Sequence, residues 1–175
     1  MPDSLRGQLL IASPALTDFF RRAVVLVVEH GEEGALGVVL NRPSEHRVAD
    51  AVPALAELAE PDDVVYAGGP VGPSGVIALG DFERPDDAGR LVVGGLGVLD
   101  PNELDPPVRR VRIYAGHAGW AAGQLEGELE QEAWVVEPAD PADPFHDGDL
   151  WSHALARKGG EYALLARMPA DPSLN

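Results

Sequence analysis

The chain contains no cysteine and a single lysine, Lys158, among its 175 residues. Without cysteine it has no disulfide, no thiolate nucleophile and no cysteine-based zinc or iron–sulfur site. One lysine leaves Schiff-base chemistry and phosphate binding by lysine with a single candidate, which stands outside any matching motif. These absences exclude several large classes of enzyme and metalloprotein.

Basic residues are scarce throughout the chain. Thirteen lysines and arginines stand against 29 aspartates and glutamates, which gives a formal net charge of −16. Such a charge repels the phosphate backbone of nucleic acids, and the sequence contains no basic recognition helix. We therefore expect no direct nucleic-acid partner, so that any role in transcription would be indirect. Individual arginines can still bind a small anion.

Long hydrophobic runs are also missing. No segment approaches the roughly 20 apolar residues of a membrane-spanning helix, and residues 1–4 begin no signal peptide. We therefore expect a cytoplasmic protein with no membrane partner. The length and the 45% of hydrophobic residues predict one domain, 1–175, with a core large enough for independent folding.

The most informative segment is Phe19–Pro43, in which two apolar runs flank one polar turn. The runs, Ala23–Val28 and Ala35–Leu40, are rich in β-branched residues and too short for typical helices. Neither run alternates with polar residues, so we expect a β-hairpin whose strands are covered on both faces. The turn between them, His30–Gly34, would span about five residues.

The rest of the chain predicts more strands than helices. Strands are expected at 8–12, 64–66, 75–79, 91–93, 97–99, 108–114, 133–137 and 162–167, and helices over 44–60, 121–130 and 149–157. Pro53 either delays or kinks the first helix, residues 116–120 turn the chain into the second, and Asp149 caps the third. Several connections are too short for crossover helices, which indicates an α+β fold with a mixed, largely antiparallel sheet.

The order of motifs resembles the YqgE/AlgH family of bacterial proteins over nearly the whole chain. The matching segments are Leu9–Pro14, Phe20–Pro43, Val65–Val71, Ala115–Leu129, Trp134 and Asp171–Asn175. The resemblance implies a mixed sheet curled into a partial or pseudo-barrel with helices packed outside. Some members are described as transcriptional regulators, a description that names no chemistry, and the resemblance supplies no set of catalytic residues.

Polar residues gather at both ends of the expected hairpin. Glu29 and His30 lie near its tip, and Asn41 and Arg42 follow its second strand. An arginine and an asparagine can together hold a carboxylate or a phosphate, and histidine titrates near neutrality. The structural alternative is that Glu29 and His30 anchor the turn, Asn41 caps a bend, and Arg42 pairs with a surplus carboxylate.

A second candidate is the glycine-rich segment Gly116–Trp120 followed by Gln124. Backbone N–H groups at the start of a helix could bind an anion there, or the glycines could simply permit a sharp turn while Trp120 packs. We predict that the hairpin exit and this segment meet in one concave site. The candidate ligand-binding residues are therefore Glu29, His30, Asn41, Arg42, Gly116, Gly119, Trp120 and Gln124.

Other motifs indicate no cofactor and no metal. Gly68-Gly69-Pro70 lacks the spacing of a phosphate loop, and Ser74 misses the nucleophile-elbow spacing by one residue. The histidines form no i, i+4 pair, and the acidic loop 140–149 does not match an EF-hand. The leading interpretation is a non-catalytic binding or regulatory module for a protein or a small anionic ligand. The alternative is a hydrolase that uses His30 or His117 with a nearby carboxylate.

Overall fold

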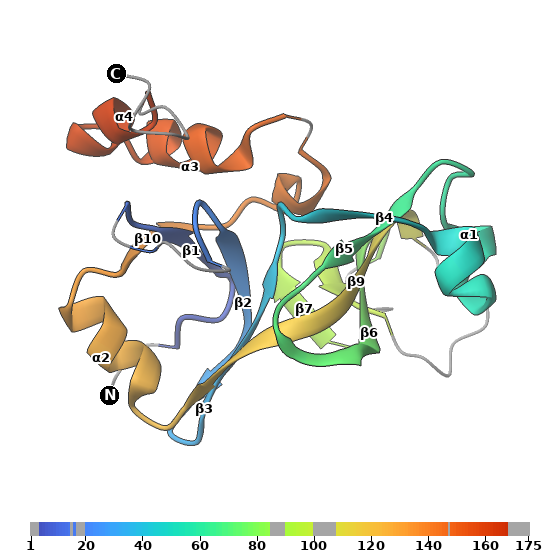
Figure 1. Cartoon of the computed structure of the whole chain (residues 1–175), viewed down its shortest axis with the longest axis horizontal. Helices are drawn as coiled ribbons and strands as arrows, with labels where there is room; N and C mark the ends of the chain where they lie inside the picture. The colour runs from blue at the N-terminus through green and yellow to red at the C-terminus, as the bar shows by residue number, and fades with distance from the viewer. Residues whose placement is uncertain are drawn as a thin grey trace.

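The structure is a computed structural model that describes residues 4–14, 16, 20–84, 90–99, 108–146 and 148–167. Phe19, Asp147 and the closing motif Asp171–Asn175 lie outside these ranges. Within them, a sheet of ten strands has short helices packed around it (Figure 1). The strands are β1 (Gln8–Ala12), β2 (Val24–Gly31), β3 (Gly34–Val39), β4 (Pro43–Arg47), β5 (Val64–Ala67), β6 (Val71–Phe82), β7 (Arg90–Val93), β8 (Leu96–Val98), β9 (Val108–Ala121) and β10 (Trp134–Pro138).

The sheet is mixed and largely antiparallel, as the sequence predicted. Its strands follow the order β10-β1-β2-β3-β9-β6-β8-β7, while β5 pairs with both β4 and β9. Among the described strands, only the pairing of β5 with β9 is parallel. The helices are α1 (Val48–Ala51), α2 (Gln124–Glu130), α3 (Leu150–Lys158) and α4 (Glu161–Leu165), with 3-10 turns η1 (Pro53–Leu58) and η3 (Asp143–Phe145).

Strands β2 and β3 form the predicted hairpin. Val24–Val28 are all buried, because this continuous apolar run is covered on both faces of the sheet. The ladder continues through the pair His30 and Ala35 and ends at Gly31 and Gly34. Only residues 32 and 33 remain for the turn, which is therefore tighter than the expected five-residue loop.

Strand β9, 14 residues long, joins the two parts of the sheet (Figure 1). Its C-terminal part pairs with β3, where Ala118 lies opposite Gly37. Its N-terminal part runs between β5 and β6, where Tyr114 lies opposite both Tyr66 and Ile77. The expected turn at 116–120 was wrong, because these residues continue the strand and the chain turns only after β9 ends.

Glycines allow β9 to bend and to pass close to the segment after β5. Gly116 has a φ of 78°, and a Cβ at this position would lie 2.4 Å from the carbonyl oxygen of Gly69. A Cβ on Gly68 would lie equally close, 2.4 Å, to the carbonyl oxygen of Gly116. The two glycine motifs of the sequence are thus explained by mutual backbone packing.

Two further predictions, one of a strand and one of a helix, also need correction. The strand expected at 162–167 is α4, in which Tyr162, Leu165 and Ala166 follow helical spacing and pack against the core. The helix expected over 44–60 begins as strand β4 and continues as two short helical pieces, because Pro53 interrupts it. In contrast, Asp149 caps α3 as predicted, by accepting a hydrogen bond from the Ser152 N–H.

The sheet is curled into a half-barrel. A Cβ on Gly7, just before β1, would lie 2.8 Å from the carbonyl oxygen of Val92 in β7, so the two ends of the sheet approach each other. Val92 and Leu96 share one buried cluster with Leu9 and Ile11. Helices α3 and α4 lie over β1 and β10 (Figure 1). No helix in the described ranges is long and apolar enough to cross a membrane.

Candidate functional site

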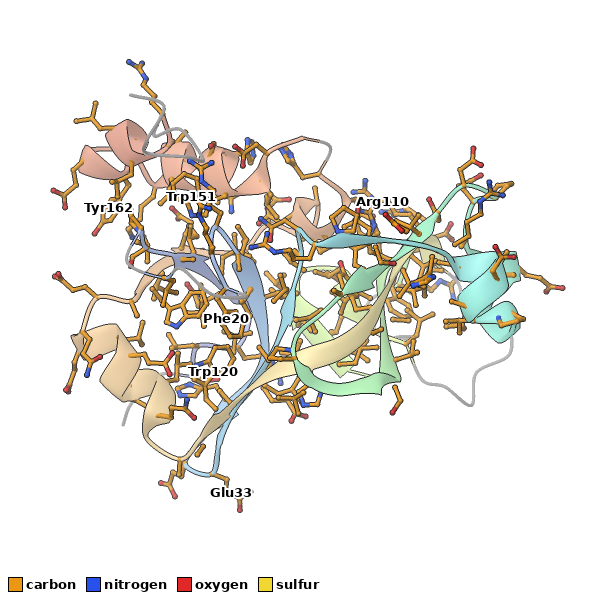
Figure 2. The ribbon with its side chains drawn as sticks, in the orientation of Figure 1. Phe20, Glu33, Arg110, Trp120, Trp151 and Tyr162 are labelled. Atoms are coloured by element: carbon orange, nitrogen blue, oxygen red, sulfur yellow. The ribbon has the colours of Figure 1, made fainter. Side chains whose placement is uncertain are left out.

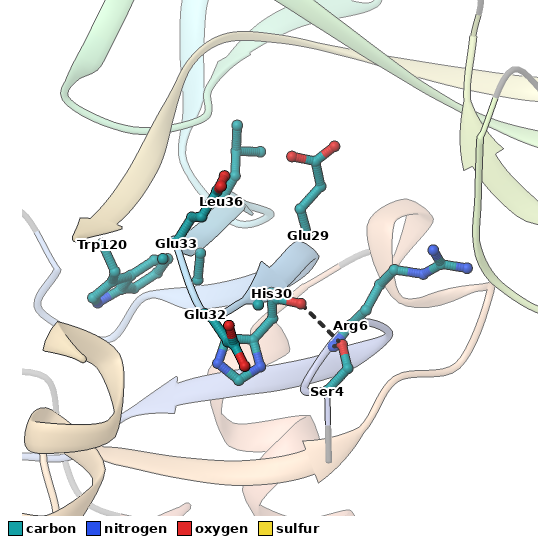
Figure 3. A pocket seen from close by; sticks show the side chains of 11 residues that line it. Ser4, Arg6, Glu29, His30, Glu32, Glu33, Leu36 and Trp120 are labelled. Carbon is teal, nitrogen blue, oxygen red and sulfur yellow. Dashed lines mark hydrogen bonds between the residues drawn. The ribbon is translucent and has the colours of Figure 1, made fainter. Parts of the chain in front are cut away.

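The structure divides the predicted ligand-binding residues between the two ends of the hairpin. Glu29, His30 and Trp120 line an open cavity of about 880 Å³ at the hairpin tip (Figure 3). We call it the tip cavity; its walls are residues 29–36, Ser4, Arg6 and Trp120. Asn41 lies instead at the base of the hairpin. Of the predicted site residues, Glu29, His30 and Trp120 thus line one cavity and Asn41 lines another.

The charge of the tip cavity opposes a small anionic ligand. Its walls include three carboxylates, Glu29, Glu32 and Glu33, against one guanidinium, Arg6. In Figure 3 the Glu29 side chain stands between those of Leu36 and Arg6. Because like charges repel an anion that enters this space, the tip cavity does not suit the ligand class that the sequence suggested.

His30 connects three parts of the chain. Its Nδ1 accepts a hydrogen bond of 2.9 Å from the Leu5 N–H, and its Nε2 lies 3.4 Å from Oε2 of Glu126. The first contact requires the ring proton to be on Nε2, from which it can be donated to the carboxylate. With 6% of its side chain exposed, His30 has neither nitrogen free to act as a general base. These contacts support the structural alternative, in which His30 anchors the hairpin turn.

Trp120 and Gln124 hold α2 against the sheet through a residue that the sequence analysis missed. The indole N–H groups of Trp120 and Trp134 donate to Oε1 of Glu128 at 3.1 and 2.9 Å. Gln124 donates to Oε2 of the same carboxylate at 3.1 Å and accepts from the Ala121 N–H at 2.9 Å. Glu128 resembles a solvated helix residue in sequence, and only its i, i+4 spacing from Gln124 could have indicated this role.

The remaining residues of the glycine-rich segment lie along β9. Gly116 marks the bend of the strand, and Gly119 is exposed. His117 lies opposite Val71 on β6 and forms no ion pair with a carboxylate of the described chain. The hydrolase alternative therefore finds a carboxylate beside His30 but none paired with His117.

Asn41 and Arg42 close the base of the hairpin. The Asn41 side chain accepts from the Val24 N–H at 3.0 Å and donates to the Arg22 carbonyl at 2.9 Å. The Arg42 guanidinium donates to the carbonyl oxygens of Asn41 and Arg21. Partial burial lowers the pKa of Arg42 from its ordinary value. Both residues thus tie the end of β3 to the segment that precedes β2.

A smaller cavity of about 200 Å³ opens beside Asn41. We call it the base cavity. The described residues that line it include no carboxylate, and they come from the hairpin exit, β5 and the segment that leads into α3. The lining residues are Leu40, Asn41, Pro43, Tyr66, His146, Gly148 and Leu150.

Arginine and aromatic side chains surround one wall of the base cavity. Arg112 donates to the hydroxyl of Tyr66 at 2.6 Å, and its guanidinium lies 4.5 Å from the centre of that ring. The guanidinium of Arg110, which Figure 2 labels, lies 4.3 Å from the centre of the Phe145 ring. The guanidinium of Arg112 lies 5.8 Å from the same ring centre. Both cations therefore interact with aromatic faces beside the cavity. Sequence reasoning missed this cluster because its members come from three distant segments.

Tyr114 lies directly behind this wall. Its ring centre is 5.9 Å from that of Tyr66, and its side chain is fully buried. Its hydroxyl has no hydrogen-bond partner within the described part of the chain. Burial raises the pKa of Tyr114 far above its ordinary value, an effect that outweighs the opposing charge of Arg112.

Two histidines stack on each other beside the base cavity. His146 lines the cavity and stacks on His153 of α3, with ring centres 4.2 Å apart. Nearby, Arg22 lies over the Trp151 ring and 3.8 Å from the Asp149 carboxylate. In a protein with a net charge of −16, this end of the hairpin thus collects an unusual share of cationic and titratable nitrogen.

The acidic loop before α3 is occupied by internal contacts. Asp143 is 4% exposed and accepts two hydrogen bonds of 2.9 Å from Arg157, whose pKa is raised chiefly by this contact. Asp140 accepts from the Ala142 N–H. No group of three or more histidines and carboxylates that could hold a metal ion occurs in the described ranges.

The geometry defines an α+β half-barrel protein with a polar cavity at each end of its central hairpin. An AlgH-like family model matches residues 9–163, and the chain belongs to this family. It is 45% identical to a UPF0301 protein of Streptomyces coelicolor, over 98% of this chain and 96% of the relative.

Two solved structures share the fold. The crystal structure of a Corynebacterium diphtheriae protein is 30% identical, with a TM-score of 0.84 over 95% of this chain and 93% of the other. The solution structure of the AlgH protein of Pseudomonas aeruginosa is 34% identical, with a TM-score of 0.70 over 97% and 96% of the two chains. The names of these relatives state no activity.

Proposed function

We propose that the protein is a non-catalytic, cytoplasmic binding module whose ligand is a small anion held in the base cavity. One observation supports this above all: in a strongly acidic chain, the described residues that line the cavity supply hydrogen-bond donors and no carboxylate. An anion in this space would meet these donors, and none of the described lining residues carries a like charge.

The hydrogen bonds that the lining side chains already form show which of their protons can still be donated to an anion. The Tyr66 oxygen accepts from Arg112, which leaves the phenolic proton to donate and polarises it. Asn41 uses one of its two amide protons for the Arg22 carbonyl and retains the other. His146 supplies a ring N–H. Three side chains can therefore donate to one small anion.

The size of the base cavity favours an anion such as a carboxylate or a phosphate. A volume of about 200 Å³ accommodates a group of this size together with several waters, each of which occupies roughly 30 Å³ in the liquid. It is too small for a nucleotide with its base and sugar. A binding role also fits the contacts of His30, the better of the two hydrolase candidates, because Leu5 and Glu126 engage both of its ring nitrogens.

The test is an NMR titration with sodium acetate and sodium phosphate at constant ionic strength. We expect backbone amide shifts to cluster at residues 40–42, 66, 146 and 148–150, and Tyr66→Phe and His146→Ala to weaken binding about fivefold or more. His46→Ala, an exposed histidine outside the base cavity, is the matched control. Shifts confined to other regions, or equal binding by all variants, would refute the proposal.

A further inference from the structure

We infer that the outer edge of β10 binds an extended segment of a partner protein as an additional strand of the sheet. The segment is apolar in its centre and flanked by basic residues. It occupies a cavity of about 550 Å³ beside β10, which we call the edge groove. The edge groove shares no lining residue with the base cavity, so this inference does not depend on the proposed function.

Strand β10 has a neighbouring strand on one side only. It ends the strand order of the sheet, and within the described ranges β1 is the one strand that pairs with it. The Ser13 N–H donates to the carbonyl oxygen of Ala133, so the odd-numbered residues of this segment face β1. The even-numbered residues, Trp134, Val136 and Pro138, therefore direct their backbone polar groups to the outer edge.

Basic side chains cap part of this outer edge. Lys158 donates to the carbonyl oxygen of Val136 at 2.7 Å, and Arg157 donates to that of Pro138 at 3.2 Å. Pro138 has no N–H of its own. In the part of the chain that the structure describes, the N–H and C=O of Trp134 and the N–H of Val136 have no hydrogen-bond partner. These groups form a donor, an acceptor and a donor at strand spacing, which the backbone of an added strand satisfies.

Apolar side chains line the edge groove on both faces of the sheet. Figure 1 shows β10 between α2 on one side and α3 with α4 on the other. Leu129 of α2 packs on the face of Trp134, whereas Tyr162 and Leu165 of α4 pack on the face of Val135. Because successive side chains of a strand point to opposite faces, a bound segment places apolar side chains against both walls. The volume falls in the range of roughly 300–1,000 Å³ that ligand pockets have.

The charges around the edge groove favour basic residues on either side of the apolar centre. Glu132 and Glu161 line the groove, and neither forms an ion pair within the described ranges. Lys158 already donates to Val136 and lies 5.4 Å from the centre of the Tyr162 ring. The net charge of −16 also attracts a basic segment from a distance.

A second copy of the chain fits the edge groove less well than a single extended segment does. The β10 strand of the second copy lies between the same helices, so two recessed edges cannot approach each other closely. Two molecules that each carry a net charge of −16 also repel each other. A partner segment that is only one strand wide meets neither obstacle.

Hydrogen exchange of the whole protein, measured by NMR, tests the free edge. We expect the amides of Trp134 and Val136 to exchange about tenfold or more faster than those of Val135 and Glu137, which face β1. Slow exchange of the first two in the free protein would overturn the proposal, because the edge would already be paired. Protection that disappears on dilution would identify a second copy as the occupant, and protection that persists would identify another segment of the chain, such as 168–175.

A peptide titration tests the occupant. The probe is acetyl-Lys-Val-Leu-Val-Lys-amide, which should slow the exchange of Trp134 and Val136 and shift amides at 129–136 and 158–165. N-methylation of its first valine and its leucine removes a strand N–H in either register, and should weaken binding about fivefold or more. Glutamates in place of both lysines should weaken it further. Equal binding by the N-methylated peptide, or the absence of any effect at 134–136, would overturn the proposal.

Two neighbouring leucines of α4 provide matched variants. Leu165 lines the edge groove, whereas Leu164 is 70% exposed and does not line it. Leu165→Ala should weaken binding of the probe about threefold or more, and Leu164→Ala should leave it unchanged. Equal effects at both positions would contradict the assigned groove. The peptide analogues test the same proposal on the unaltered protein, so the conclusion stands even where Leu165→Ala impairs folding.

Discussion

At the scale of single residues, buried polar atoms show which contacts the fold requires. Glu128 satisfies two indoles and a glutamine with one carboxylate, and Asp143 satisfies Arg157 with two hydrogen bonds. Tyr114 differs, because its buried hydroxyl has no partner within the described ranges. An unpaired buried hydroxyl has lost its bonds to water without replacement, so removing it should cost little.

We therefore expect Tyr114→Phe to leave the free energy of unfolding unchanged or to raise it by up to about 1 kcal/mol. Tyr66→Phe, the matched control, loses the bond from Arg112 and should lower it by about 1 kcal/mol. Urea denaturation measures both changes. If Tyr114→Phe lowered stability by more than about 1 kcal/mol, the hydroxyl would have a partner, such as a buried water.

The raised pKa of Tyr114 also predicts how stability changes in alkali. An unfolded tyrosine ionises near pH 10, whereas the buried one keeps its proton to higher pH. Above about pH 10 the unfolded state thus binds fewer protons than the folded state, and stability falls as pH rises. Wild type should lose stability more steeply above pH 10 than Tyr114→Phe does, and equal slopes would contradict the burial of this phenol.

At the scale of elements, β9 positions the strands that pair with it, β3, β5 and β6. It pairs with three strands, and it can do so because its backbone bends at Gly116 and passes tightly against Gly69. The same strand contains a glycine with no such constraint: a Cβ on Gly119 would meet only a Val71 methyl group, at 3.8 Å. The two positions therefore form a natural pair for comparison.

We expect Gly116→Ala to lower the free energy of unfolding by about 2 kcal/mol or more, since it combines a positive φ with a backbone clash. Gly119→Ala should change it by no more than about 0.5 kcal/mol in either direction. Thermal or urea denaturation distinguishes them. Similar effects at both positions would mean that the bend in β9 is not fixed by Gly116.

At the scale of the whole molecule, the net charge of −16 governs which partners can approach. The arginines beside the base cavity face aromatic rings and a tyrosine hydroxyl, rather than forming a continuous basic surface. Such a molecule can bind a small anion locally while its overall field repels a polyanion.

We accordingly predict weak or absent direct DNA binding at physiological salt. A gel-shift assay with a pool of random-sequence duplexes, followed by selection of bound sequences, should find no enriched site. Sequence-specific binding with a Kd of about 10⁻⁸ M or tighter would contradict this prediction. Binding that appears only at very low salt would not contradict the prediction, because such binding reflects nonspecific contacts with phosphate.

Much of the fold could be predicted because it is encoded locally. The continuous apolar runs of the hairpin predicted two strands, of which β2 is buried over Val24–Val28 and β3 only over its second half, and Asp149 predicted the start of α3. The errors arose where local patterns are ambiguous. The apolar run at 162–167 fits either a strand or a helix, and glycines at 116–120 permit either a turn or a bent strand.

The sequence alone determined the charge of the protein, the absence of thiol chemistry, the α+β class and the identity of the polar residues at the hairpin ends. Only the tertiary structure decided which of those residues share a cavity. Parallel pairing of β5 with β9 places Arg112 on Tyr66, and the loop before α3 places His146 in the lining of the same cavity as Tyr66. No local pattern specifies these contacts, because they join segments dozens of residues apart and depend on how the whole sheet curls.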